Sequence, residues 1–316
     1  MSKKVIRRDK TCLNCYHVVE KLHCPNCGQE NIEPRKTFHE LFIHFIEDLT
    51  HYENSFWKTI RNLIFKPGSL TREYLSGRRM SYLAPFRLYI FISFVTFLIL
   101  SLIPTKFDPF ANVTVDGVPI NQTENRAEND AFDLGYSSVA EIDSIQKFDP
   151  EYFGTFEYSM LRKMQMLSEK YTAKEFAFLF AESLRNNLPK LLFIYLPLFT
   201  FVLYLFESKK RWYYFDHGIF TLHYFSFLLL MLLIVQIVKS ILNPLTHFTL
   251  IQIVSKLFTI AVYGYALYYF FPAHHRFYKS TRLVTIIKGS LMFAINMILL
   301  LIIFVGASIY ILQKMH

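Results

Sequence analysis

The chain has 316 residues and a net charge of +9, and hydrophobic residues make up 53% of it. With a mean hydropathy of +0.25, this composition argues against a soluble domain, which would have to bury five long apolar helices one after another. Aromatic residues reach 17%, and such rings are typical of lipid-facing surfaces and of the membrane interface.

All four cysteines lie near the N-terminus, in two C-x2-C pairs separated by eight residues: Cys12, Cys15, Cys24 and Cys27. A two-residue gap lets both thiolates of a pair point at one ion, and four thiolates satisfy tetrahedral Zn2+ without leaving an open position. We therefore predict that residues 1–35 form a cytosolic knuckle around one structural zinc ion. The metal would supply most of its folding free energy, because so short a segment lacks a hydrophobic core.

Three other interpretations of the cysteines stay open. An iron site of the rubredoxin type uses the same ligands, and spacing does not exclude it. A thioredoxin-like redox pair would accompany a βαβ unit, which the sequence does not show. Two disulfides would need an oxidising compartment, whereas this segment is expected in the reducing cytosol.

Residues 36–85 are predicted to form amphipathic juxtamembrane helices, because apolar residues recur there at spacings of three and four. We expect these helices to lie along the membrane interface, and packing against the ends of the spans is the alternative. One of them carries four polar residues on a single face: His44, Glu47, Asp48 and His51. This cluster is either a metal or acid–base site, which His274 and His275 would be able to join, or an ordinary solvated face.

The run at 67–79, PGSLTREYLSGRR, followed by YLAPFRLY at 82–89, resembles the signature of the DUF3667 family. This is a group of uncharacterised bacterial membrane proteins whose members often begin with a paired C-x2-C knuckle. The resemblance covers roughly residues 10–100. It implies the membrane topology and the zinc site, but no activity.

Four arginines in or near this run gather before and at the start of the first apolar run: Arg72, Arg78, Arg79 and Arg87. The simpler interpretation is a positive-inside anchor. The alternative is a site for phosphate or a phospholipid headgroup, because a guanidinium group binds phosphate through two parallel hydrogen bonds. The run also predicts a short helix that begins at an N-cap on Ser69 and ends near Gly77.

Five apolar runs are each predicted to be a transmembrane helix, since they approach or exceed the length needed to cross the hydrocarbon core. They are 86–103, 189–206, 219–242, 250–271 and 284–312, the last four forming a four-helix membrane region over 189–316. Basic residues fall on alternate sides, in 1–85 and in the loops at 207–218 and 272–288. This predicts a multi-pass protein of the bacterial inner membrane with a cytosolic N-terminus and an extracytoplasmic C-terminus.

The segment 104–188 is then extracytoplasmic. We expect little regular structure over 111–150, which is polar and acidic, and a helical hairpin over 156–187. Within the spans, Lys239 and Lys256 are expected to extend toward the headgroups, while His223 and Asn296 bond neighbouring helices. If these four side chains converged, they would form the polar cavity of a transporter.

The sequence contains no motif of a familiar enzyme class, which argues weakly against an enzyme, and no catalytic residue is assigned. The leading interpretation is a binding, assembly or regulatory role at the membrane, with the knuckle used for structure or for docking a partner. A transporter or lipid-handling protein is one alternative, and a membrane-embedded metal-dependent enzyme is another. The expected partners are the bilayer and either a cytosolic protein or an anionic phospholipid, but no nucleic acid. The ligand and the oligomeric state stay open.

Overall fold

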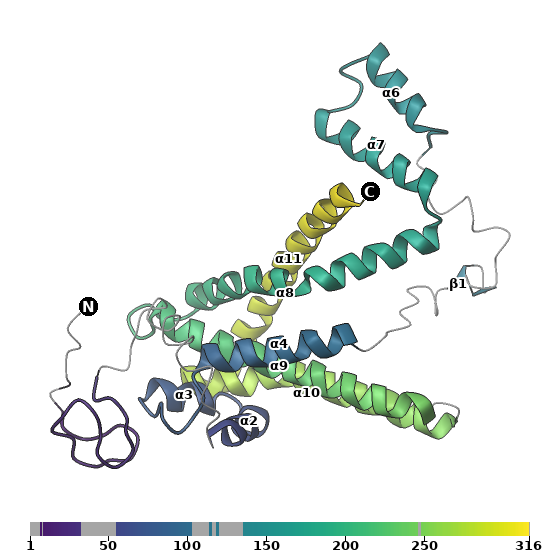
Figure 1. Cartoon of the computed structure of the whole chain (residues 1–316). Coiled ribbons are helices and arrows are strands. Elements are labelled where there is room, and N and C mark those ends of the chain that lie inside the picture. The colour runs from purple at the N-terminus through teal and green to yellow at the C-terminus, as the bar shows by residue number, and fades with distance from the viewer. Residues whose placement is uncertain are drawn as a thin grey trace. The chain divides into compact units, whose positions relative to one another are not determined.

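The computed structural model describes residue 7 and residues 9–32, 55–102, 114–115, 118–119, 135–245 and 248–315. In this part of the chain the fold is almost entirely helical, with nine α-helices and one short 3-10 helix (Figure 1). The chain divides into two compact units. The first is Met1–Ile103 with Ile194–Ile298, and the second is Pro104–Phe193 with Leu299–His316.

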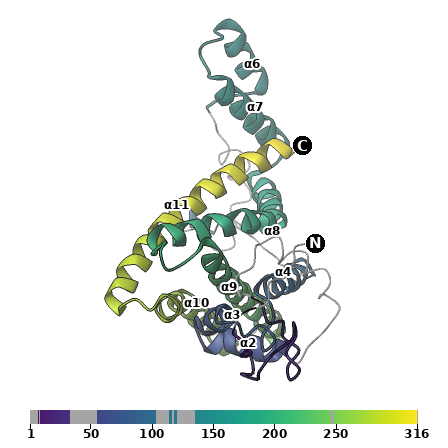
Figure 2. The same ribbon diagram turned by 90° about the vertical axis from the view of Figure 1, so that its left-hand side faces the viewer.

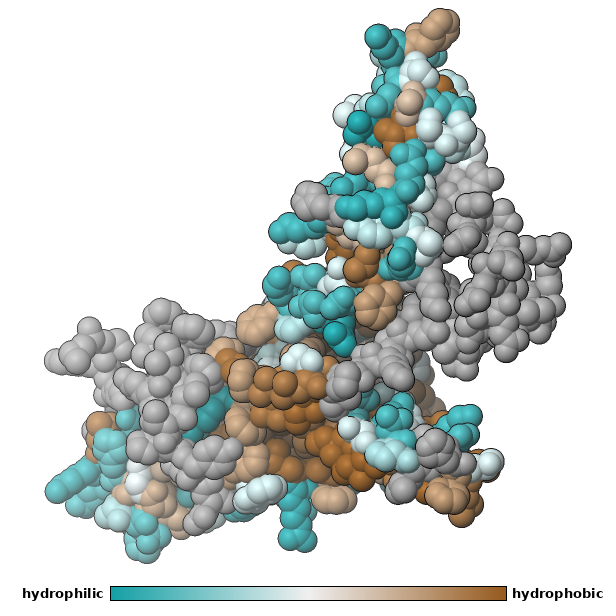
Figure 3. All heavy atoms as spheres, turned by 45° about the vertical axis from the view of Figure 1, so that its right-hand side comes forward, coloured by the Kyte–Doolittle hydropathy of each residue, from teal (hydrophilic) through white to brown (hydrophobic). Residues whose placement is uncertain are grey.

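Five helices are long and apolar enough to cross a membrane, which confirms the predicted all-α membrane fold. They are α4 (Pro85–Leu102), α8 (Ala173–Phe206), α9 (Tyr214–Leu242), α10 (Thr249–Tyr278) and α11 (Arg282–Lys314). The face in Figure 3 carries a broad brown area of hydrophobic residues, and side chains such as Ile260 and Leu301 are more than half exposed. Exposed apolar surface of this extent is typical of helices that face lipid.

The fourth span is longer than its apolar run. Helix α10 continues through Pro272 to Tyr278, where Lys279 ends it in the left-handed conformation with φ 54°. The prediction of a loop at 272–288 is therefore wrong for most of its length, because α10 continues to Tyr278 and α11 begins at Arg282. His274 and His275 lie on α10. At 1.5 Å per residue, the 30 residues of α10 measure about 45 Å, more than the ~30 Å of a hydrocarbon core, so part of the helix must project or tilt.

The C-termini of α8 and α10 and the N-termini of α9 and α11 meet at one end of the first unit. Glu207, just after α8, accepts a hydrogen bond from Lys288 of α11. Trp212, just before α9, packs on Phe277 of α10 with ring centroids 4.7 Å apart. The chain therefore returns to this end after every second span, and we call it the loop end of the bundle.

Two short helices, α2 (Ser55–Phe65) and α3 (Ser69–Leu75), lie against the ends of α9 and α10 (Figure 2). The hydroxyl groups of Tyr265 and Tyr269 on α10 donate hydrogen bonds to the carbonyl oxygens of Ile64 and Leu63, both at 2.6 Å. Leu63 is fully buried. Of the two arrangements expected for the amphipathic segment, α2 thus adopts packing against the spans.

The other face of α2 stays outside this packing. Trp57 is 76% exposed and Phe65 is 71% exposed, and Arg61 is exposed on the same helix. An aromatic and basic face of this kind suits the level of lipid headgroups.

The turn between α2 and α3 explains why the chain places Gly at position 68. Gly68 has φ 72° and is the N-cap of α3, so the prediction of an N-cap on Ser69 is wrong by one residue. The Ser69 hydroxyl instead donates to the carbonyl of Lys66. A Cβ atom on Gly68 would lie 2.5 Å from the carbonyl oxygen of Ala273, so a side chain here would push α3 away from α10.

In the second unit, α6 (Val139–Phe148) and α7 (Thr155–Lys170) form an antiparallel hairpin. Asp143 accepts hydrogen bonds from Arg162 and Tyr158, both at 2.8 Å. The region 156–187 is helical as expected, but its second part belongs to the long helix α8, and α7 pairs instead with α6. Helix α6 begins at the N-cap Ser138, inside the region predicted to have little regular structure, so that part of the prediction is wrong. A two-residue antiparallel pair joins β1 (Thr114–Val115) to β2 (Val118–Pro119).

The bond from Tyr269 to α2 gives a first prediction. Tyr269→Phe leaves the buried Leu63 carbonyl without this donor, so the free energy of unfolding should fall by about 1–3 kcal/mol. Tyr268→Phe is the matched control, since Tyr268 is 62% exposed and should change it by less than ~0.5 kcal/mol. Thermal and chemical unfolding in detergent would measure both, and equal effects would contradict this role of Tyr269.

Candidate metal centre

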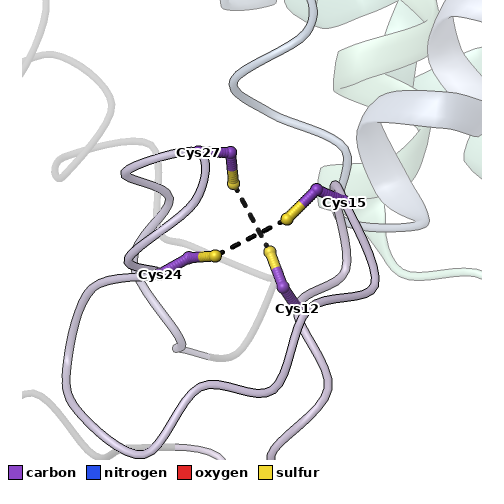
Figure 4. A group of neighbouring side chains, drawn as sticks. All are labelled: Cys12, Cys15, Cys24 and Cys27. Carbon is purple, nitrogen blue, oxygen red and sulfur yellow. Dashed lines mark hydrogen bonds between the residues drawn. The ribbon is translucent and has the colours of Figure 1, made fainter.

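The four cysteines converge on one point (Figure 4). All four sulfur atoms lie within 4.8 Å of one another, with 3.6 Å from Cys12 to Cys27 and 3.5 Å from Cys15 to Cys24. A tetrahedral ion with metal–sulfur bonds of about 2.3 Å spaces its sulfurs by about 3.8 Å, whereas a disulfide needs about 2.05 Å. The thiols are free, and their arrangement fits a four-thiolate metal ion.

Two turns of the same design build this centre. In the first, the Cys12 amide donates to the His17 carbonyl and the Tyr16 amide donates to the Cys12 carbonyl. In the second, the Cys24 amide donates to Gln29 and the Gly28 amide donates to Cys24. Tyr16 and Gly28 occupy equivalent positions, and both have positive φ, 63° and 74°.

The ionisation of the thiols favours a bound cation. The backbone N–H of His17 lowers the pKa of the Cys15 thiol to about 6, whereas burial raises the pKa of the Cys27 thiol to about 12. The four sulfurs therefore do not all become thiolates at neutral pH on their own. A bound metal ion would supply the positive charge that lets them ionise together, and its binding would release protons.

The core of the knuckle is very small. Its buried hydrophobic residues are Cys12, Val19 and Cys24, with Cys15 and Cys27 packed against them. A core with a single buried aliphatic side chain contributes little to the free energy of folding. We therefore expect the folding of the knuckle to depend on the bonds that its four thiols form with a metal ion.

The knuckle docks on a loop that follows α3, residues 77–81, which we call the docking loop. Gln29 is buried, and its amide nitrogen donates to the Gly77 carbonyl at 2.5 Å. Its amide oxygen accepts from the backbone N–H groups of Arg79 and Met80, at 3.2 and 3.4 Å. One side chain thus forms three hydrogen bonds to the backbone of this loop.

The first turn of the knuckle makes the other contacts. Ser81 donates to the Asn14 side chain at 2.6 Å, and Leu13 lies so close to Gly77 that a side chain at Gly77 would have no room. The equivalent residues of the second turn, Pro25 and Asn26, are exposed.

Tyr16 shows why the two turns differ at their positive-φ position. Gly is the residue that adopts positive φ without strain, and it stands at this place in the second turn. In the first turn, Arg78 donates a hydrogen bond to the Tyr16 hydroxyl and lies over the ring, 5.4 Å from its centroid. The aromatic ring therefore brings a contact with the docking loop that Gly would not.

The four arginines of the predicted phosphate or headgroup site have different surroundings. Arg72 is exposed on α3, and Arg78 forms an ion pair with Glu73 at 2.9 Å. Arg79 lies over the Tyr74 ring at 5.2 Å, and Arg87 is half-buried in the first turn of α4. Because Arg78 already has a carboxylate partner, a phosphate site made from all four stays a prediction.

The other predicted polar residues separate into three groups. His44, Glu47, Asp48 and His51 lie outside the described residues. His223 bonds Thr71 of α3 at 3.0 Å, and Asn296 accepts from Tyr195 of α8 at 2.8 Å. Lys239 and Lys256 are exposed. The four residues of the hypothetical transporter cavity thus do not converge, and the extension of both lysines toward the headgroups stays a prediction.

A polar cluster at the loop end was missed by sequence reasoning. It consists of Glu207, His217, His274, Tyr278 and Lys288, which come from four helices or their ends. The predicted loops at 207–218 and 272–288 contain Glu207, His274 and His275, and the sequence gives no reason to bring these loops together. Two features of the sequence could have indicated this cluster. Glu207 directly follows one apolar run, and the pair His274 and His275 lies within one helical turn of the end of another apolar run.

Comparison with known proteins agrees with these findings. Residues 53–97, which include α2, α3, the docking loop and most of α4, match the model of a family described as "Protein of unknown function (DUF3667)". This match confirms the predicted resemblance to the DUF3667 family over these residues. Neither a curated protein nor a solved structure matches the chain.

Gln29 gives a second prediction. Gln29→Ala removes three hydrogen bonds between the knuckle and the docking loop, so the amide protons of Arg79 and Met80 should exchange with solvent at least about tenfold faster. His17→Ala is the matched control, because His17 holds the equivalent place in the first turn but is exposed. Hydrogen exchange measured by mass spectrometry tests this, and unchanged exchange in Gln29→Ala would disprove the docking.

Proposed function

We propose that the chain is an integral multi-pass protein of the bacterial inner membrane with a binding, assembly or regulatory role. In it, one zinc ion folds the knuckle, and the folded knuckle holds the docking loop in place. The observation that carries this proposal is the set of three hydrogen bonds from Gln29 to residues 77–80. They join the metal centre to the segment that matches the family model.

A structural role for the metal follows from its ligands. Four thiolates complete the tetrahedral shell of zinc and leave no position for a substrate or water. Once bound, the ion would supply charge compensation and the cross-link between the two turns. The connection between the knuckle and the docking loop is made by side chains of the knuckle, namely Gln29, Asn14 and Tyr16.

The orientation rests on the charges at the loop end. Arg61, Lys66 and the docking-loop arginines lie there, as do three further basic groups: Lys209–Arg211, Arg276 to Lys279, and Arg282 with Lys288. The opposite ends of the spans carry few basic residues close to the membrane. Under the positive-inside rule the loop end, and with it the knuckle, faces the cytosol.

Two surfaces support the proposed partners. The exposed Trp57, Arg61 and Phe65 of α2 would meet anionic phospholipid headgroups, with each basic residue near the surface contributing about 1 kcal/mol. A cytosolic protein partner would meet the exposed part of the knuckle. Binding is favoured over catalysis because the metal shell is closed.

The metal gives a third prediction. The purified full chain should contain one zinc ion, and Cys24→Ser should lose it because three thiolates no longer complete the shell. His23→Ala should retain the metal, since His23 is exposed and pairs with Glu30 at 3.6 Å. Metal analysis by mass spectrometry tests both. Iron in place of zinc, or full zinc retention in Cys24→Ser, would contradict the proposal.

Removal of the metal separates its structural role from simple binding. If a chelator takes out the ion, the amide protons of Arg79 and Met80 should lose protection as in Gln29→Ala. Protection that persists without metal would mean that the ion does not hold the knuckle on the docking loop.

The topology gives a fourth prediction. Alkaline phosphatase fused after α11 should be active, because five spans that begin in the cytosol end outside it. The same enzyme inserted in the Lys279–Thr281 turn should be inactive, and a fluorescent reporter should show the opposite pattern. Phosphatase activity from the turn, or from a fusion to the N-terminus, would reverse the assignment of the cytosolic side.

A further inference from the structure

The polar cluster at the loop end is distinct from the metal centre. Glu207 lies directly after α8 with a side chain that is 6% exposed. Lys288 of α11 donates to its Oε1 atom at 3.0 Å, and Nε2 of His274 on α10 lies 3.3 Å from the same oxygen. One carboxylate oxygen therefore faces two groups that are each able to carry a positive charge.

Lys288 is able to move away from Glu207 more easily than His274 is. The Lys288 side chain is 31% exposed, whereas His274 is fully buried. A lysine at a half-exposed position is able to turn toward water on its long flexible stem, but the imidazole is held among the helices. If Lys288 turns away, a proton on His274 is what can balance the buried carboxylate.

A second imidazole continues the cluster toward the bundle interior. His274 packs on Tyr278 with ring centroids 4.5 Å apart, and the Tyr278 hydroxyl bonds Nδ1 of His217 at 2.6 Å. Among the described residues, Nδ1 of His274 and Nε2 of His217 are buried and have no hydrogen-bond partner. A buried ring nitrogen without a partner is costly, and ionisable groups at such places in membrane proteins are typical of functional sites.

Glu207 itself is tuned to stay ionised. Burial acts to raise the pKa of its carboxyl group, but His274 and Lys288 outweigh this and hold the pKa below its ordinary value. These two neighbours thus favour the ionised form of the Glu207 carboxyl group, which needs a cation beside it. The titratable and charged groups around His274 come from four helices or their ends: Glu207 after α8, Asp216 and His217 on α9, Tyr278 on α10 and Lys288 on α11.

We propose that Glu207 and His274 form a proton-binding site in which a proton on His274 takes the place of Lys288 as the counter-cation of Glu207. The proton comes from water at the loop end, and the only bond formed is an N–H bond on the imidazole. Lys288 keeps its own proton and moves to solvent. The site exchanges one positive charge beside Glu207 for another, so the cluster is able to take up a proton without adding net charge next to the carboxylate.

Trp212 is a built-in reporter of this exchange. Its ring packs on Phe277 at 4.7 Å and on Tyr278 at 5.4 Å, and Tyr278 contacts His274. The chain has two tryptophans, so Trp57→Phe leaves Trp212 as the only one. In this background, with the full zinc-loaded chain in lipid nanodiscs, Trp212 fluorescence should change in one step between about pH 5 and 8, where imidazoles titrate.

Variants then decide the assignment. His274→Gln should abolish the step, and the matched control His275→Gln should keep it. Lys288→Met removes the competing cation, so the step should move to higher pH by about one to three units. Glu207→Gln removes the negative charge and should move the step to lower pH or abolish it.

A purely structural ion pair predicts a different result. It would leave the fluorescence without a step in this range, or with one that survives His274→Gln, and either outcome overturns the proposal. A shift of the same sign in Lys288→Met and Glu207→Gln overturns it as well. If Glu207→Gln does not fold, Lys288→Met and His274→Gln still decide, because Lys288 is half-exposed and its replacement leaves the helix packing intact.

Discussion

The packing of α3 against the ends of α9 and α10 is the contact on which the rest of the first unit depends. Gly68 lets the start of α3 approach Ala273, and Tyr74 packs on Ile219 inside the bundle. His223 of α9 forms a hydrogen bond with Thr71 of α3. Helix α2 directly precedes α3 in the chain, and the docking loop, to which the knuckle bonds, follows it, so a shift of this short helix would move all three.

This contact also explains why the family match lies where it does. Residues 53–97 contain little that would carry a reaction, but they contain each element that connects the bundle to the metal centre. The positive-φ glycines at 68 and 77 each stand where a side chain would collide with another segment. Because the backbone approaches another segment closely at both positions, only glycine fits there, and this restricts the sequences that are able to form the fold.

The sequence predicted those features that depend on local composition. Long apolar runs predict spans because no other structure satisfies the backbone in lipid, and two C-x2-C pairs predict their own convergence. The end of α10 could not be predicted in this way. Its end, which includes His274 and Tyr278, is rich in polar residues and follows Pro272, so in the sequence it resembles a loop. In the fold this end is buried against Trp212, Phe220 and Glu207, which come from distant parts of the chain. The cluster around Glu207 joins residues up to 81 positions apart, and no periodicity in the chain contains that information.

The two turns of the knuckle are nearly equal in backbone but unequal in surroundings. The tip of the first is covered by the docking loop through Leu13 and Asn14, while Pro25 and Asn26 at the tip of the second are open to solvent. The tip of the Cys24–Cys27 turn is therefore accessible from solvent, whereas the docking loop contacts the tip of the first turn. Of the two similar turns, one thus anchors the knuckle and the other is open to solvent, and the convergence of their four thiols makes the position of each depend on the other.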